Sequence, residues 1–110
     1  MIMYHALVYL KRYLYGKGKQ FRKTITVMTS CKPVIIDVRN PAEFERGHMK
    51  GAVNISIDRI TSIIPDLIRK QKPVIVTSTK GERSETATGF LKEAGVDAYD
   101  GGSWVNLEKW

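Results

Sequence analysis

The sequence predicts one small α/β domain built around a mainly parallel β-sheet. Short runs rich in β-branched residues alternate with stretches whose apolar residues recur at helical spacing. A length of 110 residues fits one compact domain. The hydrophobic share of 43% is enough to form a core. The sequence contains no internal repeat and no low-complexity linker, so we expect these elements to fold together.

The first strand is expected at residues 33–38, an apolar run typical of a strand that is buried on both faces. A short helix is expected at residues 41–46, because Asn40 suits the N-cap position, a proline follows, and Glu43 lies in the first turn. Gly47 is placed to end this helix.

The middle of the chain predicts two more strands around a helical segment. Residues 52–55 and 74–76 are short apolar runs that favour buried strands. Between them, residues 57–68 carry isoleucines and leucine at helical spacing, and Pro65 should break or kink the helix. Residues 77–81 are polar and predict a turn.

The last part of the chain predicts one long helix, one strand and one short helix. The long helix should begin near Ser84 and stop at Gly95. A final strand is expected at residues 96–99, followed by a turn at residues 101–102. Ser103 then suits the cap of a helix that ends at Trp110.

The net charge of +7 is confined to the N-terminal part of the chain. Residues 1–36 contain seven basic residues and no acidic one, whereas residues 37–110 contain eleven of each. We therefore divide the chain into a basic extension, residues 1–30, and a domain, residues 31–110. Residues 24–27 could add an edge strand. We expect a solvated or packed extension rather than contact with a membrane or nucleic acid.

Several classes of protein are excluded by composition. A single cysteine, Cys31, allows no internal disulfide framework, and His5 and His48 stand too far apart to suggest a metal site. We expect neither a metal nor a cofactor. No apolar run reaches the roughly 18 residues of a membrane span. Basic Lys11 and Arg12 follow the apolar start instead of preceding it, so we expect no secretory signal and a cytoplasmic protein.

The segment after the third predicted strand is the candidate ligand site, because ligands of open parallel sheets bind at the carboxyl ends of strands. A helix start there offers unpaired amides, Gly81 permits a tight turn, and Arg83 adds a forked cation. These features predict a cradle for sulfate, thiosulfate or phosphate. Lys80 could tune affinity, and Ser84 could contact the anion or cap its helix. The residues of this loop are Ser78, Thr79, Lys80, Gly81, Glu82, Arg83 and Ser84.

Three motifs in sequence order resemble the signatures of the rhodanese-like family. The family pattern is Asp-Val-Arg, Glu-Phe and Gly-His-Ile-x-Gly-Ala-x-Asn-Ile, then an active-site loop, then Gly-Gly-x-x-x-Trp. The corresponding segments here are Asp37-Val38-Arg39 with Glu43-Phe44 and residues 47–55, then Gly81-Glu82-Arg83-Ser84 with Ala87, then Gly101-Gly102-Ser103-Trp104. The resemblance implies a parallel sheet of about five strands with helices on both faces.

The resemblance also implies a chemistry that this chain departs from. Active members carry sulfur on a loop cysteine, whose thiolate takes it from a donor such as thiosulfate and passes it to cyanide or a thiol. The loop spans six residues from Cys to Arg, so counting back from Arg83 places Ser78 at the nucleophile position. A loop one residue longer, as in related phosphatases, would start at Thr77. We therefore expect no sulfur transfer at this site.

Three explanations remain open for the serine. The first is an introduced change of a natural cysteine to Ser78, the second is a natural substitution in a non-catalytic member, and the third is that Cys31 supplies the thiol. The atypical neighbours Thr77 and Thr79 favour a natural substitution. The expected partners are a small sulfur-containing anion, a thiol acceptor or a protein, and the oligomeric state is left open.

Three further residues are expected to support the loop. By the resemblance, Asp37 and Arg39 form a charge pair behind it, although Asp37 could equally cap the next helix locally. His48 is expected to bond backbone groups rather than act as a base. Glu43 is expected to be a first-turn residue favoured by the helix dipole.

Overall fold

The computed structural model describes residues 24, 26–27 and 32–109. Four strands form one sheet in the order β2-β1-β3-β4, and every neighbouring pair is parallel. The elements, in chain order, are β1 (Val34–Asp37), α3 (Pro41–Glu45), β2 (Val53–Asn54), the 3₁₀ helix η1 (Ile57–Ile63), α4 (Ile64–Lys70), β3 (Val74–Ser78), α5 (Glu82–Glu93), β4 (Ala98–Ser103) and α6 (Trp104–Leu107).

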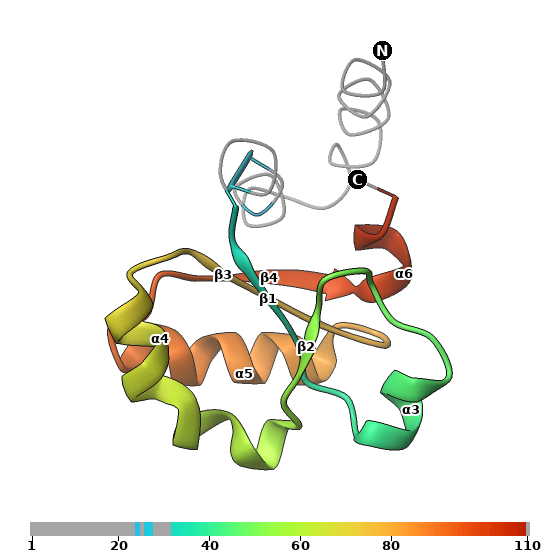
Figure 1. Cartoon of the computed structure of the whole chain (residues 1–110), viewed down its shortest axis with the longest axis horizontal. Helices are drawn as coiled ribbons and strands as arrows, with labels where there is room; N and C mark the ends of the chain where they lie inside the picture. The colour runs from blue at the N-terminus through green and yellow to red at the C-terminus, as the bar shows by residue number, and fades with distance from the viewer. Residues whose placement is uncertain (1–23, 25, 28–31, 110) are drawn as a thin grey trace.

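Helices cover both faces of the sheet, as the α/β prediction requires. Figure 1 shows α4 and α5 on one side of the sheet and α6 on the other. The larger core lies between the sheet and the α4 and α5 side, where Ile36, Val76 and Leu91 are buried. A smaller core lies on the α6 side and contains Met49, Ile75 and Leu107. No helix of the described residues is long and apolar enough to cross a bilayer.

The part of the chain that the structure describes contains four strands, where about five were expected. The expected edge strand at residues 24–27 is wrong, because Thr24, Thr26 and Val27 are helical. The hydroxyl of Thr24 donates to the carbonyl of Asp100 at 2.7 Å, and Val27 packs against the smaller core. Strand propensity reports how well a side chain fits its neighbours, so tertiary contacts overrode it here.

The start of α3 follows its local sequence. Asn40 accepts a hydrogen bond from the amide of Glu43 at 2.9 Å, and the Glu43 carboxylate accepts one from the amide of Asn40 at 3.1 Å. This capping box satisfies amides that the helix itself leaves unpaired. Gly47, with φ of 154°, follows the helix where the prediction placed its end.

The polar residues after the third strand do not form a loop at once. β3 continues through Thr77 to Ser78, and both residues are fully buried. α5 begins at Glu82, two residues before the position expected from the apolar pattern. The true loop between strand and helix is therefore only residues 79–81, which brings the helix start directly against the strand end.

The predicted turn at residues 101–102 is also wrong, because both glycines lie within β4. Val76 pairs with Asp100 and Thr77 with Gly102, so Gly101 is the extra residue of a β-bulge. A Cβ atom at Gly101 would lie 2.9 Å from Ile75 Cγ2 and 3.1 Å from the Val76 carbonyl oxygen. The glycine is needed for close packing in the strand and not for a turn.

Ser103 precedes α6 as expected, but its side chain makes no capping hydrogen bond. The helix ends at Leu107, before the predicted end at Trp110. Trp110 and Cys31 lie outside the described residues, as do residues 1–23 of the basic extension. The expectations placed on those residues therefore stay predictions.

Candidate active-site loop

The loop after β3 wraps two backbone amides around the side chain of Ser78. Ser78 Oγ accepts hydrogen bonds from the amide of Gly81 at 3.1 Å and from the amide of Ser84 at 3.3 Å. The turn depends on Gly81, whose φ of 95° lies in the left-handed region that favours glycine. The loop and the first turn of α5 thus converge on the position that the sequence assigned to the nucleophile.

Among the described residues, no base is hydrogen-bonded to the hydroxyl of Ser78. Within the described part of the chain, its hydrogen-bond partners are those two backbone amides and no side chain. A serine needs an adjacent general base to become a nucleophile near neutral pH. The arrangement can stabilise negative charge at this position but does not generate it.

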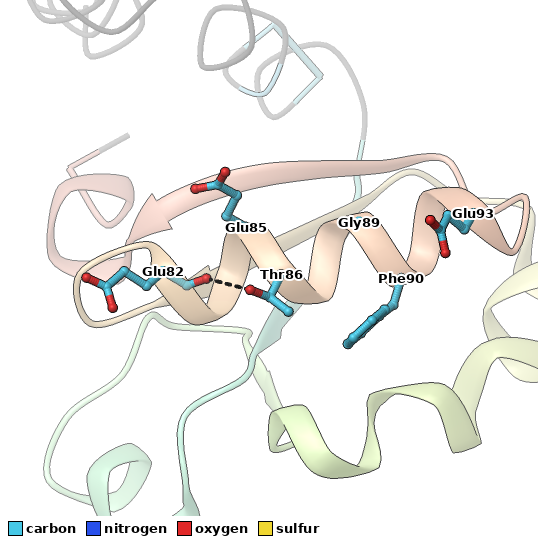
Figure 2. Close-up of a pocket in the computed structure, with 6 residues that line it drawn as sticks. All are labelled: Glu82, Glu85, Thr86, Gly89, Phe90 and Glu93. Carbon is cyan, nitrogen blue, oxygen red and sulfur yellow. Dashed lines mark hydrogen bonds between the residues drawn. The ribbon is translucent and has the colours of Figure 1, made fainter.

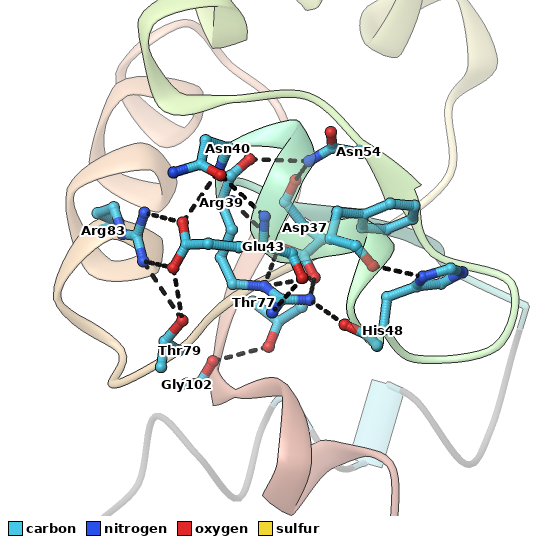
Figure 3. A network of polar contacts seen from close by, with 12 residues as sticks. Asp37, Arg39, Asn40, Glu43, His48, Asn54, Thr77, Thr79, Arg83 and Gly102 are labelled. Atoms are coloured by element: carbon cyan, nitrogen blue, oxygen red, sulfur yellow. Dashed lines mark hydrogen bonds and ion pairs between the residues drawn. The ribbon is translucent and has the colours of Figure 1, made fainter.

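The guanidinium of Arg83 forms a bidentate ion pair with Glu43 of α3 and is therefore not free in the loop. Its Nη1 donates to Glu43 Oε1 at 2.7 Å and its Nη2 to Glu43 Oε2 at 3.0 Å (Figure 3). The Arg83 hydrogen bonds, with help from the amide of Asn40, lower the pKa of Glu43 to about 2. The same contacts raise the pKa of Arg83. Sequence reasoning placed Glu43 in the first turn of a helix and missed this ion pair.

A hollow of about 240 Å³ opens beside this pair. Its lining carries two carboxylates and two cationic side chains, so its formal charge is balanced; the lining residues are Glu43, Ser78, Thr79, Lys80, Glu82 and Arg83. Lys80 and Thr79 are exposed, which leaves the hollow open to solvent. Five of the seven loop residues named from the sequence therefore line the hollow, and Gly81 and Ser84 do not.

Ser84 faces the protein interior instead of the hollow. Its hydroxyl lies 2.7 Å from Asp100 Oδ1 and 3.0 Å from the carbonyl oxygen of Gly81, and it is fully buried. Asp100 also accepts the amide of Gly102 at 2.9 Å, and Thr77 Oγ1 donates to the Gly102 carbonyl at 2.7 Å. These bonds fasten the loop to β4, so Ser84 serves the site through its amide and not through its hydroxyl.

Asp37 and Arg39 form a buried ion pair behind the loop. Arg39 Nε and Nη2 reach Asp37 Oδ1 and Oδ2 at 3.0 and 2.8 Å, and both residues are buried. Arg39 also donates to the carbonyls of Glu43, at 3.3 Å, and Gly47, at 2.7 Å, and lies over the ring of Trp104. The pair therefore holds the backbone of α3, and with it Glu43, against the sheet.

His48 lies apart from the chemistry. Its Nδ1 lies 2.8 Å from the carbonyl oxygen of Phe44, and its ring stacks on Phe44 with centroids 3.7 Å apart. The residue is exposed, and Figure 3 shows it on the far side of the polar network from Arg83. Its contacts are those of a structural residue. Among the described residues, no group of three His, Cys, Asp or Glu could hold a metal ion.

A larger hollow, of about 460 Å³, lies on the outer face of α5 and is separate from the loop chemistry. Figure 2 shows its lining spread along the helix, with Phe90 projecting from it; the lining residues are Glu82, Glu85, Thr86, Gly89, Phe90 and Glu93. It shares only Glu82 with the loop hollow. It is a surface depression over a position without a side chain, Gly89.

The model of the rhodanese-like domain family matches residues 23–105. The chain belongs to the rhodanese-like family. Two rhodanese-like structures have the same fold. One is described as a rhodanese with anions from E. coli, with a TM-score of 0.62 and 28% identity over 67% of this chain and 89% of that chain. The other is a rhodanese-like domain protein from Staphylococcus aureus, with a TM-score of 0.58 and 25% identity over 80% of this chain and 86% of that chain.

Curated relatives of this rhodanese-like domain carry a different description. A tRNA uridine(34) hydroxylase from Staphylococcus saprophyticus is 33% identical over 89 residues, which cover 76% of this chain and 27% of the relative. One from Bacillus pumilus is 37% identical and covers 68% of this chain and 26% of the relative. The chain spans about a quarter of the length of these relatives.

Proposed function

We propose that this rhodanese-like domain is a non-catalytic binding module, whose loop holds a small anion and transfers no sulfur at position 78. The observation that carries the proposal is the serine side chain at the focus of the loop. Its oxygen is held by the amides of Gly81 and Ser84, at 3.1 and 3.3 Å. A persulfide needs a sulfur atom there, and a hydroxyl cannot replace it.

The reactivity of the side chain supports the absence of catalysis. Thiols titrate near pH 8.5, so a cradle of amides can bring a thiolate into the neutral range. An uncharged serine hydroxyl requires a base, and within the described residues none is bonded to Ser78. The same amides that would activate a cysteine therefore leave the serine a hydrogen-bonded alcohol.

The free amides of the loop support anion binding. In the described part of the chain, the backbone N–H groups of Thr79, Lys80, Glu82 and Arg83 donate to no protein acceptor. Together with the start of the twelve-residue helix α5, they present donors and positive potential at the hollow. A tetrahedral oxyanion such as sulfate or thiosulfate has acceptors in every direction and suits such a set of donors.

The test is a thiosulfate to cyanide sulfur-transfer assay on the unmodified chain, on Cys31→Ser, and on Ser78→Cys combined with Cys31→Ser. Replacing Cys31 removes the only other thiol, so any persulfide must form at position 78. Thr79→Cys in the same background is the matched control. It puts a thiol in the loop, but away from the hydrogen bonds that the Gly81 and Ser84 amides donate to position 78. Mass spectrometry detects the persulfide as a gain of one sulfur atom.

The unmodified chain should show no turnover, and Ser78→Cys should form a persulfide that Thr79→Cys does not form. Turnover by the unmodified chain with Cys31 intact, lost in Cys31→Ser, would assign the activity to Cys31 and refute the proposal. A persulfide on both cysteine variants would show that the loop confers no special reactivity at position 78.

A second candidate function rests on the relatives and on the basic extension. The relatives at 33% and 37% identity are named as enzymes that act on uridine 34 of tRNA, and residues 1–36 carry seven basic residues and no acidic one. Such a segment would bind RNA through its phosphates, with an affinity that falls steeply with salt. In this case the domain would belong to an RNA-modifying protein.

Binding of transfer RNA to variants of the 110-residue chain separates the two candidates. One variant replaces four basic residues of the extension with glutamine, and its control replaces four exposed lysines of the domain; these are Lys17, Lys19, Arg22 and Lys23 against Lys50, Lys70, Lys72 and Lys92. A loss of binding confined to the first variant would support the RNA candidate. Equal binding by both would remove it.

A further inference from the structure

We infer that the Glu43 carboxylate acts as an internal anion bound to Arg83. Glu43 competes with any ligand anion for the guanidinium and so sets the specificity of the loop. The inference rests on the proposed anion-binding function of the loop. Glu43 comes from α3 and Arg83 from α5, forty positions later in the chain. Their ion pair closes one side of the hollow, where both residues line it.

Three residues donate hydrogen bonds to the Glu43 carboxylate. Oε1 accepts from Arg83 Nη1 at 2.7 Å and from the amide of Asn40 at 3.1 Å. Oε2 accepts from Arg83 Nη2 at 3.0 Å and from Thr79 Oγ1 at 3.3 Å. A guanidinium fork binds a bidentate carboxylate well, and Glu43 occupies the Nη1–Nη2 edge of Arg83 in this way.

The position of Glu43 is enforced by the rest of the fold. The capping box with Asn40 holds its side chain at the start of α3, and buried Arg39 donates to its backbone carbonyl at 3.3 Å. Arg39 is itself fixed by Asp37 at 2.8 Å. Glu43 is therefore held by the capping box and by Arg39 as well as by Arg83, and its carboxylate would stay near the hollow after a ligand displaced it.

An anion that binds Arg83 in the loop must displace the Glu43 carboxylate, and this exchange costs free energy. To use the Arg83 fork it must break two charge-assisted hydrogen bonds and then remain beside the displaced Glu43 carboxylate. Lys80 is the remaining cation of the lining, and Glu82 offsets it. We expect free sulfate or thiosulfate to bind the unmodified loop weakly, through amides and without Arg83.

The test is a sulfate titration followed by amide NMR spectra, at constant ionic strength, on the full chain and on Glu43→Gln. The shifts of the Gly81 and Arg83 amides report binding at the loop. Glu43→Gln should bind sulfate at least about tenfold more tightly. This factor corresponds to about 1.4 kcal/mol in the free energy of binding. Glu82→Gln is the matched control, because it removes the same charge from the same hollow without a hydrogen bond to Arg83. Its gain should stay below about threefold.

A double variant shows whether the gain runs through Arg83. Measured against Arg83→Gln alone, Glu43→Gln combined with Arg83→Gln should show no gain, whereas a general charge effect would keep the gain. Should Glu43→Gln fail to fold, Glu43→Asp serves instead, because its shorter side chain keeps the charge at the helix start but cannot reach both nitrogens of Arg83. It should show a smaller gain in the same direction.

The outcomes separate this inference from the proposed function. Loop binding with equal affinity in the full chain and in Glu43→Gln would overturn the inference and leave the anion-binding loop standing. Equal gains in Glu43→Gln and Glu82→Gln would also overturn it. Sulfate binding at the loop in none of the variants would overturn both the inference and the anion-binding proposal.

Discussion

The replacement of Gly101 by alanine should destabilise the domain, although it adds only one methyl group. The residue is buried in β4, at the bulge opposite Val76 and Thr77. Its added Cβ would lie 2.9 Å from Ile75 Cγ2, 3.0 Å from Leu107 Cδ2 and 3.1 Å from the carbonyl oxygen of Val76. These contacts are all shorter than ordinary van der Waals separation.

The size of the loss follows from which of those atoms can move. The two side-chain ends can shift by a few tenths of an ångström, but the Val76 carbonyl belongs to a buried central strand. Overpacking of a filled core costs about 1–3 kcal/mol in the free energy of unfolding. The backbone contact places Gly101→Ala toward the upper end of that range. At about 4 °C for each kcal/mol in a domain of this size, the melting temperature should fall by about 4–12 °C.

The assay is urea unfolding followed by circular dichroism, with Gly89→Ala as the matched control. Gly89 is exposed in the middle of α5, and a Cβ there meets no atom within 4 Å. Alanine in a helix interior is favoured over glycine by about 0.5–1 kcal/mol, so the control should be stabilised. A Gly101→Ala protein as stable as the unmodified chain would refute the reasoning, and so would equal losses in the two variants.

Three other predictions concern the support of the loop. Arg39→Met should cost about 3–5 kcal/mol in urea unfolding, because it leaves the carboxylate of Asp37 buried without its partner; a loss below about 1 kcal/mol would contradict a buried pair. Asn40→Ala should cost about 0.5–2 kcal/mol by the same measurement, through the lost helix cap. The pKa of Glu43 is lowered from 4.5 to about 2 in the folded protein, so its stabilising effect is complete above about pH 4.5 and is lost as the pH falls toward 2. Glu43→Gln should show a flatter fall in melting temperature across that interval, and an unchanged slope would refute the ion pair.

Local signals in the sequence predicted local structure well. The sequence around Asn40 and Glu43 predicted the start of α3, because a capping box involves only neighbouring residues. The apolar runs predicted the cores of β1 and β3, because a strand that is buried on both faces needs apolar residues throughout. The ends of elements were less predictable, since buried Thr77 and Ser78 have the composition of a turn.

Features that depend on contacts between residues far apart in the sequence were not predicted by the same reasoning. The Gly101-Gly102 pair resembles a turn in the sequence, but the contacts with Ile75 and Leu107 that require a glycine belong to other elements. The loop residues were found from their position after a strand, and all of them except Gly81 and Ser84 line the hollow. The carboxylate that pairs with Arg83 belongs to Glu43, forty positions earlier in the chain. No spacing within the loop could indicate this ion pair.

By itself, the sequence determined the α/β class and the capped start of α3, and it predicted that the candidate site lies in the loop after β3. Each of these depends on residue identity or on neighbours within a few positions. Only the tertiary structure decided that Glu43 meets Arg83, that Ser84 turns inward to Asp100 and that Gly101 lies in a strand. The physical reason is that these contacts form when α3, α5 and β4 pack at the same end of the sheet, and packing depends on the whole chain at once.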